Sequence, residues 1–245
     1  MPLHRFDAID ALRGFALLWM VLFHFCFDLN HFGYWKQDFY NDPLWTGQRT
    51  AILSLFLFCA GLGLAVALQQ GQPWRRFWRR WGQIALCAVL VSFGSWLMFP
   101  RSFIYFGVLH GIAVMLILVR ISAPWAGWFW LLGGIALGAP HAAASLLTGS
   151  PLEAVMNGAA LNWLGFITRK PVTEDYVPLF PWIGVMWWGV ACGNVLLARQ
   201  SGWLSMARHG GTRLLARLGR WSLSVYMLHQ PILIGALTLL GFARP

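Results

Sequence analysis

The chain has 245 residues, of which 58% are hydrophobic and 11% are charged. This composition excludes an ordinary soluble domain of that length and indicates an integral membrane protein. A formal net charge of +10 would suggest a nucleic-acid partner in a soluble protein. Here the basic residues separate apolar segments, so we expect them to set membrane orientation and expect no nucleic-acid partner.

Seven apolar segments have about the length of a membrane-spanning helix, which needs ~20 residues. They are 8–29, 50–68, 82–99, 104–121, 124–140, 179–198 and 221–240. Pro100, Pro124 and Pro140 mark the breaks around the third to fifth segments. The sequence therefore predicts an all-α polytopic membrane protein, a single domain over 1–245 built as a bundle of about seven transmembrane helices.

The distribution of charge predicts the orientation of this bundle. With the N-terminus in the cytoplasm, most of the 18 basic residues fall inside and most of the eight acidic residues fall outside. The positive-inside rule thus favours N-in and C-out. The first segment is too long and too polar for a cleaved signal peptide. The four cysteines stand singly in apolar runs, so we expect packing thiols rather than disulfides or a metal site.

The first segment carries charged side chains inside its apolar run, which are costly in hydrocarbon and typical of a functional helix. Asp10 and Arg13 are three residues apart and can pair, while Gly14 lets another helix approach. His24 and Asp28 are four apart, so the carboxylate can accept the imidazole N–H and orient a general base.

Two further histidines occur in apolar segments. His110 stands between Gly107 and Gly111, and His229 precedes Gln230 and a proline. A lone intramembrane histidine is either a packing residue or a functional one. The sequence leaves both interpretations open.

The loops offer candidate binding residues, each with an alternative interpretation. In the basic stretch 73–81, Arg75, Arg76 and Arg79 suit either anionic lipid or the phosphates of a nucleotide cofactor. The outer loops carry aromatic, Asn and Asp side chains that suit a saccharide, although an interfacial aromatic belt has the same composition.

Three separated strings resemble one family. They are D-A-L-R-G with M-x-x-x-H-x-x-x-D-L (10–29), F-G-V-L-H-G-I-A (106–113) and G-R-W-S-L-S-V-Y-M-L-H-Q-P (219–231). In order and spacing they resemble bacterial relatives of the heparan-α-glucosaminide N-acetyltransferase catalytic domain, within a broader group of membrane acyltransferases. The resemblance implies an enzyme of the bacterial inner membrane that moves an acyl group, here acetyl, from cytosolic acetyl-CoA to an amino or hydroxyl group of a saccharide outside.

The resemblance and the residue patterns together give a set of expected roles. The catalytic candidates are His24, Asp28, His110 and His229, with His31 as an alternative base to His24. The candidates for cofactor binding are Asp10, Arg13, Arg75, Arg76 and Arg79. The candidates for acceptor binding are Asn30, His31, Asn162, Asp175, Tyr176 and Gln230. Besides acetyl-CoA and the acceptor, we expect contact with membrane lipid, and homo-oligomer formation stays open.

Other classes remain as alternatives. Intramembrane Asp, Arg and His also form the proton relays and substrate paths of transporters. A b-type haem protein and a structural membrane subunit are further candidates.

Overall fold

The computed structural model describes residues 5–199, 202 and 210–241. This part of the chain is helical, with one isolated bridge between Phe106 and Tyr176. Six helical segments are long and apolar enough to cross a membrane. The prediction of an all-α membrane protein is confirmed at this level.

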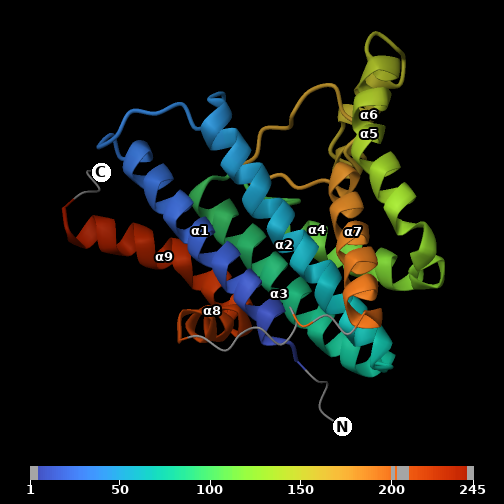
Figure 1. Cartoon of the computed structure of the whole chain (residues 1–245). Coiled ribbons are helices and arrows are strands. Elements are labelled where there is room, and N and C mark those ends of the chain that lie inside the picture. Colours follow the sequence, from blue (N-terminus) through green and yellow to red (C-terminus); the bar gives the residue numbers. More distant parts are fainter. Residues whose placement is uncertain (1–4, 200–201, 203–209, 242–245) are drawn as a thin grey trace. The chain divides into compact units, whose positions relative to one another are not determined.

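The helices are shown in chain order in Figure 1. The six long spans are α1 (Asp7–His31), α2 (Pro43–Gln69), α3 (Trp74–Met98), the 3₁₀ turn η1 (Ala123–Trp128) continuing into α5 (Phe129–Leu147), α7 (Leu179–Ala198) and α9 (Ser222–Leu239). The shorter elements are α4 (Val108–Ile121), α6 (Glu153–Asn157), η2 (Asn162–Leu164) and α8 (Gly210–Arg220).

The predicted fourth span is shorter than expected. Helix α4 has 14 residues, which rise ~21 Å against a hydrocarbon core of ~30 Å. It begins only at Val108, whose N–H donates to Asp175 Oδ2 at 2.8 Å, because Phe106 pairs with Tyr176 instead of continuing the helix. The structure therefore supports six long spans, and the expected count of seven is not confirmed.

Three other boundaries differ from the sequence prediction. Pro140 lies inside α5 rather than at its end, which membrane helices tolerate because neighbouring groups can satisfy the freed carbonyl. Helix α3 begins at Trp74, eight residues before the predicted segment 82–99, so the basic stretch forms its first turns. Helix α2 begins at Pro43, seven residues before the predicted segment 50–68.

The chain forms two compact units. The central unit contains Leu57–Arg199, and the terminal unit contains Arg5–Phe56 together with the chain after Gln200. Helix α2 begins in the terminal unit and continues in the central unit. A single domain over 1–245 stays a prediction.

In the central unit, α5 packs along α7, and α4 packs on both α3 and α7. A close helix crossing joins α2 to α7, since a Cβ added to Gly61 would lie 2.9 Å from the Cα of Gly189. The core here includes Leu57, Cys59, Met115, Val119 and Met186, all fully buried. Gly61 thus allows α2 and α7 to pack closely.

In the terminal unit, α1 packs against α8 and α9. Gly14 faces the carbonyl of Leu215, and Gly219 faces the carbonyl of Asp10, with no room for a side chain at either glycine. An aromatic core closes the other end of the unit, where Phe39 stacks on Trp45 and meets Phe23 edge-on.

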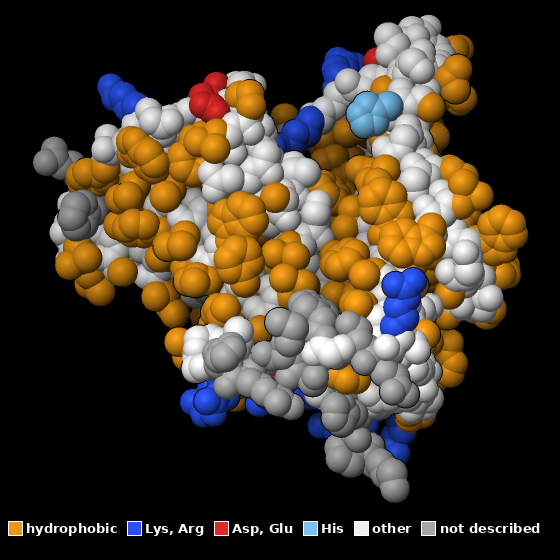
Figure 2. Space-filling view, viewed as in Figure 1, with side chains coloured by type: hydrophobic (Ala, Val, Ile, Leu, Met, Phe, Trp, Pro, Cys, Tyr) orange, Lys and Arg blue, Asp and Glu red, His pale blue; other side chains and the backbone are white. Residues whose placement is uncertain are grey.

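Hydrophobic side chains form much of the surface seen in Figure 2. One exposed stripe follows α3 and contains Leu86, Val89, Leu90, Phe93 and Leu97, each at least half exposed. Such a stripe is expected where a helix faces lipid rather than water.

Candidate active site

Helices α1 and α9 bring four polar side chains together inside the terminal unit. His24 and Asp28 come from α1, and His229 and Gln230 come from α9. Gln230 Nε2 donates a hydrogen bond to Asp28 Oδ1 at 2.8 Å. The ring centroids of His24 and His229 lie 5.0 Å apart. We call these four residues the α1–α9 polar cluster.

The expected hydrogen bond between His24 and Asp28 does not form. The amide of Gln230 takes one oxygen of the Asp28 carboxylate, and the His24 ring instead contacts His229 and the edge of Phe23. The spacing of His24 and Asp28 correctly predicted that both side chains lie on one side of α1. It could not show that Gln230, more than 200 positions away, would compete for the Asp28 carboxylate.

His229 is the oriented histidine of the cluster. Its Nδ1 lies 2.7 Å from the carbonyl oxygen of Tyr226. A carbonyl only accepts, so Nδ1 must carry the proton and Nε2 keeps its lone pair. An imidazole held in this tautomer by a carbonyl is in the form that a general base requires.

The cluster also holds unmatched hydrogen-bond acceptors. Asp28 Oδ2, His229 Nε2 and Gln230 Oε1 are buried, and none has a hydrogen-bond partner within the described part of the chain. With Nδ1 of His229 protonated, all three are acceptors. Leaving a buried polar group unmatched costs ~1–3 kcal/mol, so the arrangement suits a ligand that brings hydroxyl or amine donors.

A second charged group, centred on Asp10, lies near the N-terminal end of α1. Asp10 is 4% exposed, and its Oδ1 accepts a hydrogen bond from Arg13 at 2.9 Å, which confirms the predicted pair. Arg5 Nε and Arg220 Nε approach Oδ2 to 3.3 and 3.7 Å. Arg220 also pairs with Asp7.

Arg220 is a partner of Asp10 that the sequence analysis missed. The available signal was its place at the start of the third motif, directly after Gly219. Three guanidinium groups surround the Asp10 carboxylate, and one of them, that of Arg220, belongs to α8, so Asp10 links α1 to α8. This arrangement favours a structural role over the predicted contact with a cofactor.

His110 belongs to the central unit, where both of its ring nitrogens are occupied. Nε2 lies 3.1 Å from Ser92 Oγ, and Nδ1 accepts the N–H of Gly107 at 3.3 Å. Ser92 in turn donates to the carbonyl of Ile104 at 2.6 Å. His110 thereby fixes the start of α4, which favours the structural interpretation that its sequence left open.

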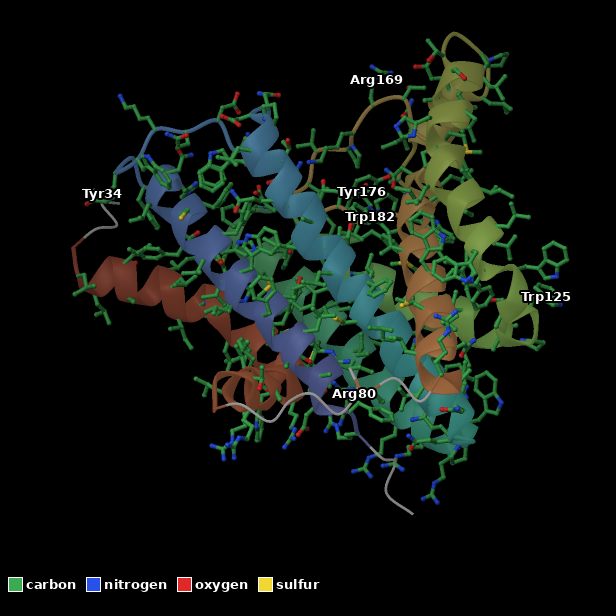
Figure 3. All side chains as sticks on the ribbon, in the orientation of Figure 1. Tyr34, Arg80, Trp125, Arg169, Tyr176 and Trp182 are labelled. Carbon is green, nitrogen blue, oxygen red and sulfur yellow. The ribbon has the colours of Figure 1, made fainter. Side chains whose placement is uncertain are left out.

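The predicted acceptor-binding residues Asn162, Asp175 and Tyr176 lie between α5 and α7, and they make structural hydrogen bonds there and at the start of α4. Asp175 holds the N–H of Val108, and the Tyr176 hydroxyl donates to the carbonyl of Asn162. Figure 3 shows Tyr176 on the segment that leads into α7. Burial and the neighbouring Tyr105 raise the pKa of Tyr176. Asn162 Oδ1 is buried and, like the Tyr105 hydroxyl, makes no hydrogen bond of normal geometry among the described residues.

The two candidates at the end of α1 differ in what they contact. Asn30 Oδ1 accepts the backbone N–H of Gln37 at 2.7 Å and so closes the loop after α1. His31 is exposed and its ring meets Phe32 at 5.3 Å.

Arg75, Arg76 and Arg79 are exposed in the first two turns of α3; Figure 3 labels the neighbouring Arg80. This turn contains no acidic residue, and the positive end of the helix dipole lies there too. The arrangement therefore attracts anions such as phosphate.

Arg120 anchors the loop before α3. It is 6% exposed, lies 4.4 Å over the Trp74 ring and 4.6 Å over the Phe77 ring, and donates to Gln72. It thus positions the first turn of α3, on which the exposed arginines stand.

The fold and the α1–α9 polar cluster define a polytopic membrane protein with titratable groups inside its helices. The family model "Heparan-alpha-glucosaminide N-acetyltransferase, catalytic" matches residues 5–231. The chain belongs to this family and is an acyltransferase-type membrane enzyme. No curated protein and no solved structure matches it.

Proposed function

We propose that the protein transfers an acetyl group from acetyl-CoA to an amino or hydroxyl group of a saccharide or glycoconjugate, on the outer side of the bacterial inner membrane. The observation that carries this proposal is the tautomer of His229. Its Nδ1 donates to the Tyr226 carbonyl, so Nε2 has a free lone pair beside His24.

The chemistry needs a base, a donor for the oxyanion and a site for the acceptor. His229 Nε2 takes the proton from the acceptor hydroxyl or amine as its oxygen or nitrogen attacks the thioester carbonyl carbon. The tetrahedral intermediate then collapses, and the C–S bond breaks. The thiolate of CoA leaves and receives the proton from His229, giving the acetylated acceptor and CoA.

His24, Asp28 and Gln230 take the remaining roles in this proposal. His24 lies in ring contact with His229 and donates an N–H to the oxyanion of the intermediate. Asp28 Oδ2 and Gln230 Oε1 are the buried acceptors that receive hydroxyl or amine hydrogens of the bound acceptor. The hydrogen bond between these two side chains fixes their orientation.

Acetyl-CoA is the proposed donor because the family name specifies acetyl transfer and CoA carries phosphates that need cations. Within the central unit, the candidates for phosphate binding are Arg75, Arg76 and Arg79, which are exposed with no acidic residue in the first turn of α3. Asp10 and Arg13, expected to join them, are engaged with each other.

A transporter is a second candidate, because buried unmatched acceptors such as Asp28 Oδ2 and His229 Nε2 also suit a proton path. The two functions differ in one respect. An acetyltransferase works in detergent without a gradient, whereas a transporter has no turnover there.

The test uses purified protein in detergent, acetyl-CoA with an isotopically labelled acetyl group, and a panel of amino sugars and neutral saccharides. Liquid chromatography with mass spectrometry follows free CoA and acetylated product. Equal amounts of both products, dependent on acceptor, are expected. Absence of CoA release with every acceptor, in protein that remains folded, would favour the transporter. Mass spectrometry of cell-envelope glycans and lipids with and without the protein then identifies the natural acceptor.

A further inference from the structure

An open apolar groove lies between α1 and α8, within the terminal unit. It has a volume of about 530 Å³, within the range of about 300–1,000 Å³ typical of ligand pockets. Its lining residues are Leu18, Leu214, Leu215, Leu218, Trp221 and Arg217. Leu214 and Trp221 are 68% and 69% exposed, so the groove is accessible from outside the protein.

The walls of the groove suit a hydrocarbon chain rather than a polar ligand. Five of the lining side chains are leucine or tryptophan, and Arg217 contributes its aliphatic stem to the wall. Gly14 and Gly219 hold α8 directly against α1. The groove is therefore a fixed feature of the packing of these two helices.

The charges around the groove suit an anion. Helix α8 carries Arg213, Arg217 and Arg220 and no acidic residue. Arg220 pairs with Asp7, but Arg213 and Arg217 are exposed and lack an ion-pair partner in the ranges that the structure describes. In Figure 2, basic side chains lie at the lower left, where Figure 1 shows α8.

We propose that this groove binds one acyl chain of an anionic phospholipid, whose phosphate is held by Arg213 and Arg217. Both halves of the ligand match the site, because the leucine wall suits a hydrocarbon chain and the two exposed guanidinium groups without an ion-pair partner among the described residues suit an anion beside it. Trp221, at the end of the groove, is a residue typical of the boundary between headgroups and acyl chains. The bound lipid then fixes α8 along the membrane surface.

The test is photo-cross-linking of the full-length protein in nanodiscs. Matched discs contain phosphatidylglycerol or phosphatidylcholine with a diazirine in one acyl chain, and mass spectrometry maps the adducts. We expect adducts on the peptides that contain Leu18 and 214–221, with several-fold higher yield from phosphatidylglycerol. R213Q/R217Q should remove this preference, and R213K/R217K should retain it.

R101Q is the matched control, because Arg101 is an exposed arginine outside the terminal unit; it should leave the pattern unchanged. Thermal unfolding shows whether each variant is folded. Equal yields from the two lipids, or adducts spread evenly over the exposed helices, would overturn the proposal. So would loss of the adducts on adding palmitoyl-CoA, because the groove would then hold the acyl chain of a CoA thioester.

Discussion

Gln230 Nε2 donates a hydrogen bond to Asp28 Oδ1 at 2.8 Å, and this bond joins α9 to α1 in the middle of the candidate active site. It couples the polar end of the first family motif to the end of the third. The bond also explains why the carboxylate does not orient His24, as the spacing of the two residues in α1 had predicted.

A double-mutant cycle measures the energy of the hydrogen bond between Gln230 and Asp28. Asp28→Leu alone leaves the Gln230 amide unmatched, and Gln230→Leu alone leaves the carboxylate unmatched, so each should lower thermal stability in detergent. The double variant should lose less stability than the sum of the losses in the two single variants. We expect a coupling energy of about 0.6 kcal/mol, the mean measured for hydrogen bonds between membrane helices, and at most about 1.7 kcal/mol. Strict additivity would show that the two side chains do not interact.

The crossing of α1 and α8 should be sensitive to a single methyl group. A Cβ at position 219 would meet the carbonyl of Asp10, and overpacking of this kind costs about 1–3 kcal/mol. Gly219→Ala should therefore lower the thermal unfolding temperature. Gly211→Ala is the matched control in the same helix, because nothing lies within 4 Å of its added Cβ. Equal effects of the two substitutions would show that α8 does not pack on α1 in this way.

The sequence predicted those features of the fold that depend on local pattern. Apolar length located all six long spans, and the bounds of α7 were predicted without error, because hydrocarbon thickness and the prolines at its start constrain them. The spacing of Asp10 and Arg13 predicted their ion pair for the same local reason. What failed were features fixed by distant residues, such as the late start of α4, which depends on Asp175.

The candidate site was predicted only in part. Its histidines, Asp28 and Gln230 were recognised because polar groups are rare inside apolar segments. Which of them touch was decided by the packing of α9 on α1, which no spacing within one helix reveals. For His110 the sequence left a packing and a functional role open, and its contacts with Ser92 and Gly107 favour the packing role.

Topology follows from the charge distribution and can be tested with cysteine labelling. With the N-terminus inside and the short helix α4 crossing as a seventh segment, a cysteine at Leu152, which is 58% exposed in the predicted outer loop, should react in intact cells with an impermeant maleimide. A cysteine at Gly211 should react only after permeabilisation. The wild-type chain measures the background from its own four cysteines. The reverse labelling pattern would mean that the N-terminus is outside or that α4 does not cross the membrane.

The loop after α5 should lose order in acid. Glu153 accepts the N–H of Gly149 and the hydroxyl of Thr168, both at 2.8 Å, and these bonds, with the charge of Arg169, lower the pKa of its carboxyl below the ordinary 4.5. Its contribution to loop order is therefore complete above the unfolded-state pKa and is lost as pH falls through the folded-state pKa. Hydrogen exchange of the Gly149 amide, corrected for the intrinsic rate, should therefore become faster as the pH falls through the folded-state pKa of Glu153.

Glu153→Gln is the control for this loop. Because the amide oxygen can still accept a hydrogen bond but does not titrate, exchange at Gly149 should become independent of pH across the same range. If the wild-type protein also showed a flat profile, the carboxylate would not hold the loop.

His24 is expected to contribute less than His229 to the rate of acetyl transfer. An N–H that stabilises an oxyanion is worth about 10²–10³ in kcat, so His24→Ala should reduce acetyl transfer by about that factor. Steady-state kinetics should show the loss in kcat rather than in the KM for acetyl-CoA. A change confined to KM would place His24 at the donor site instead.

The most direct test of the proposed function is acetyl transfer by His229→Ala. Loss of a general base removes about 10²–10⁴ in rate, so turnover of purified, folded variant should fall by that factor, and added imidazole should restore part of it. His141→Ala, at an exposed histidine of α5, should retain wild-type turnover. Wild-type turnover by His229→Ala, with an inactive His31→Ala, would contradict the assignment and place catalysis in the loop after α1.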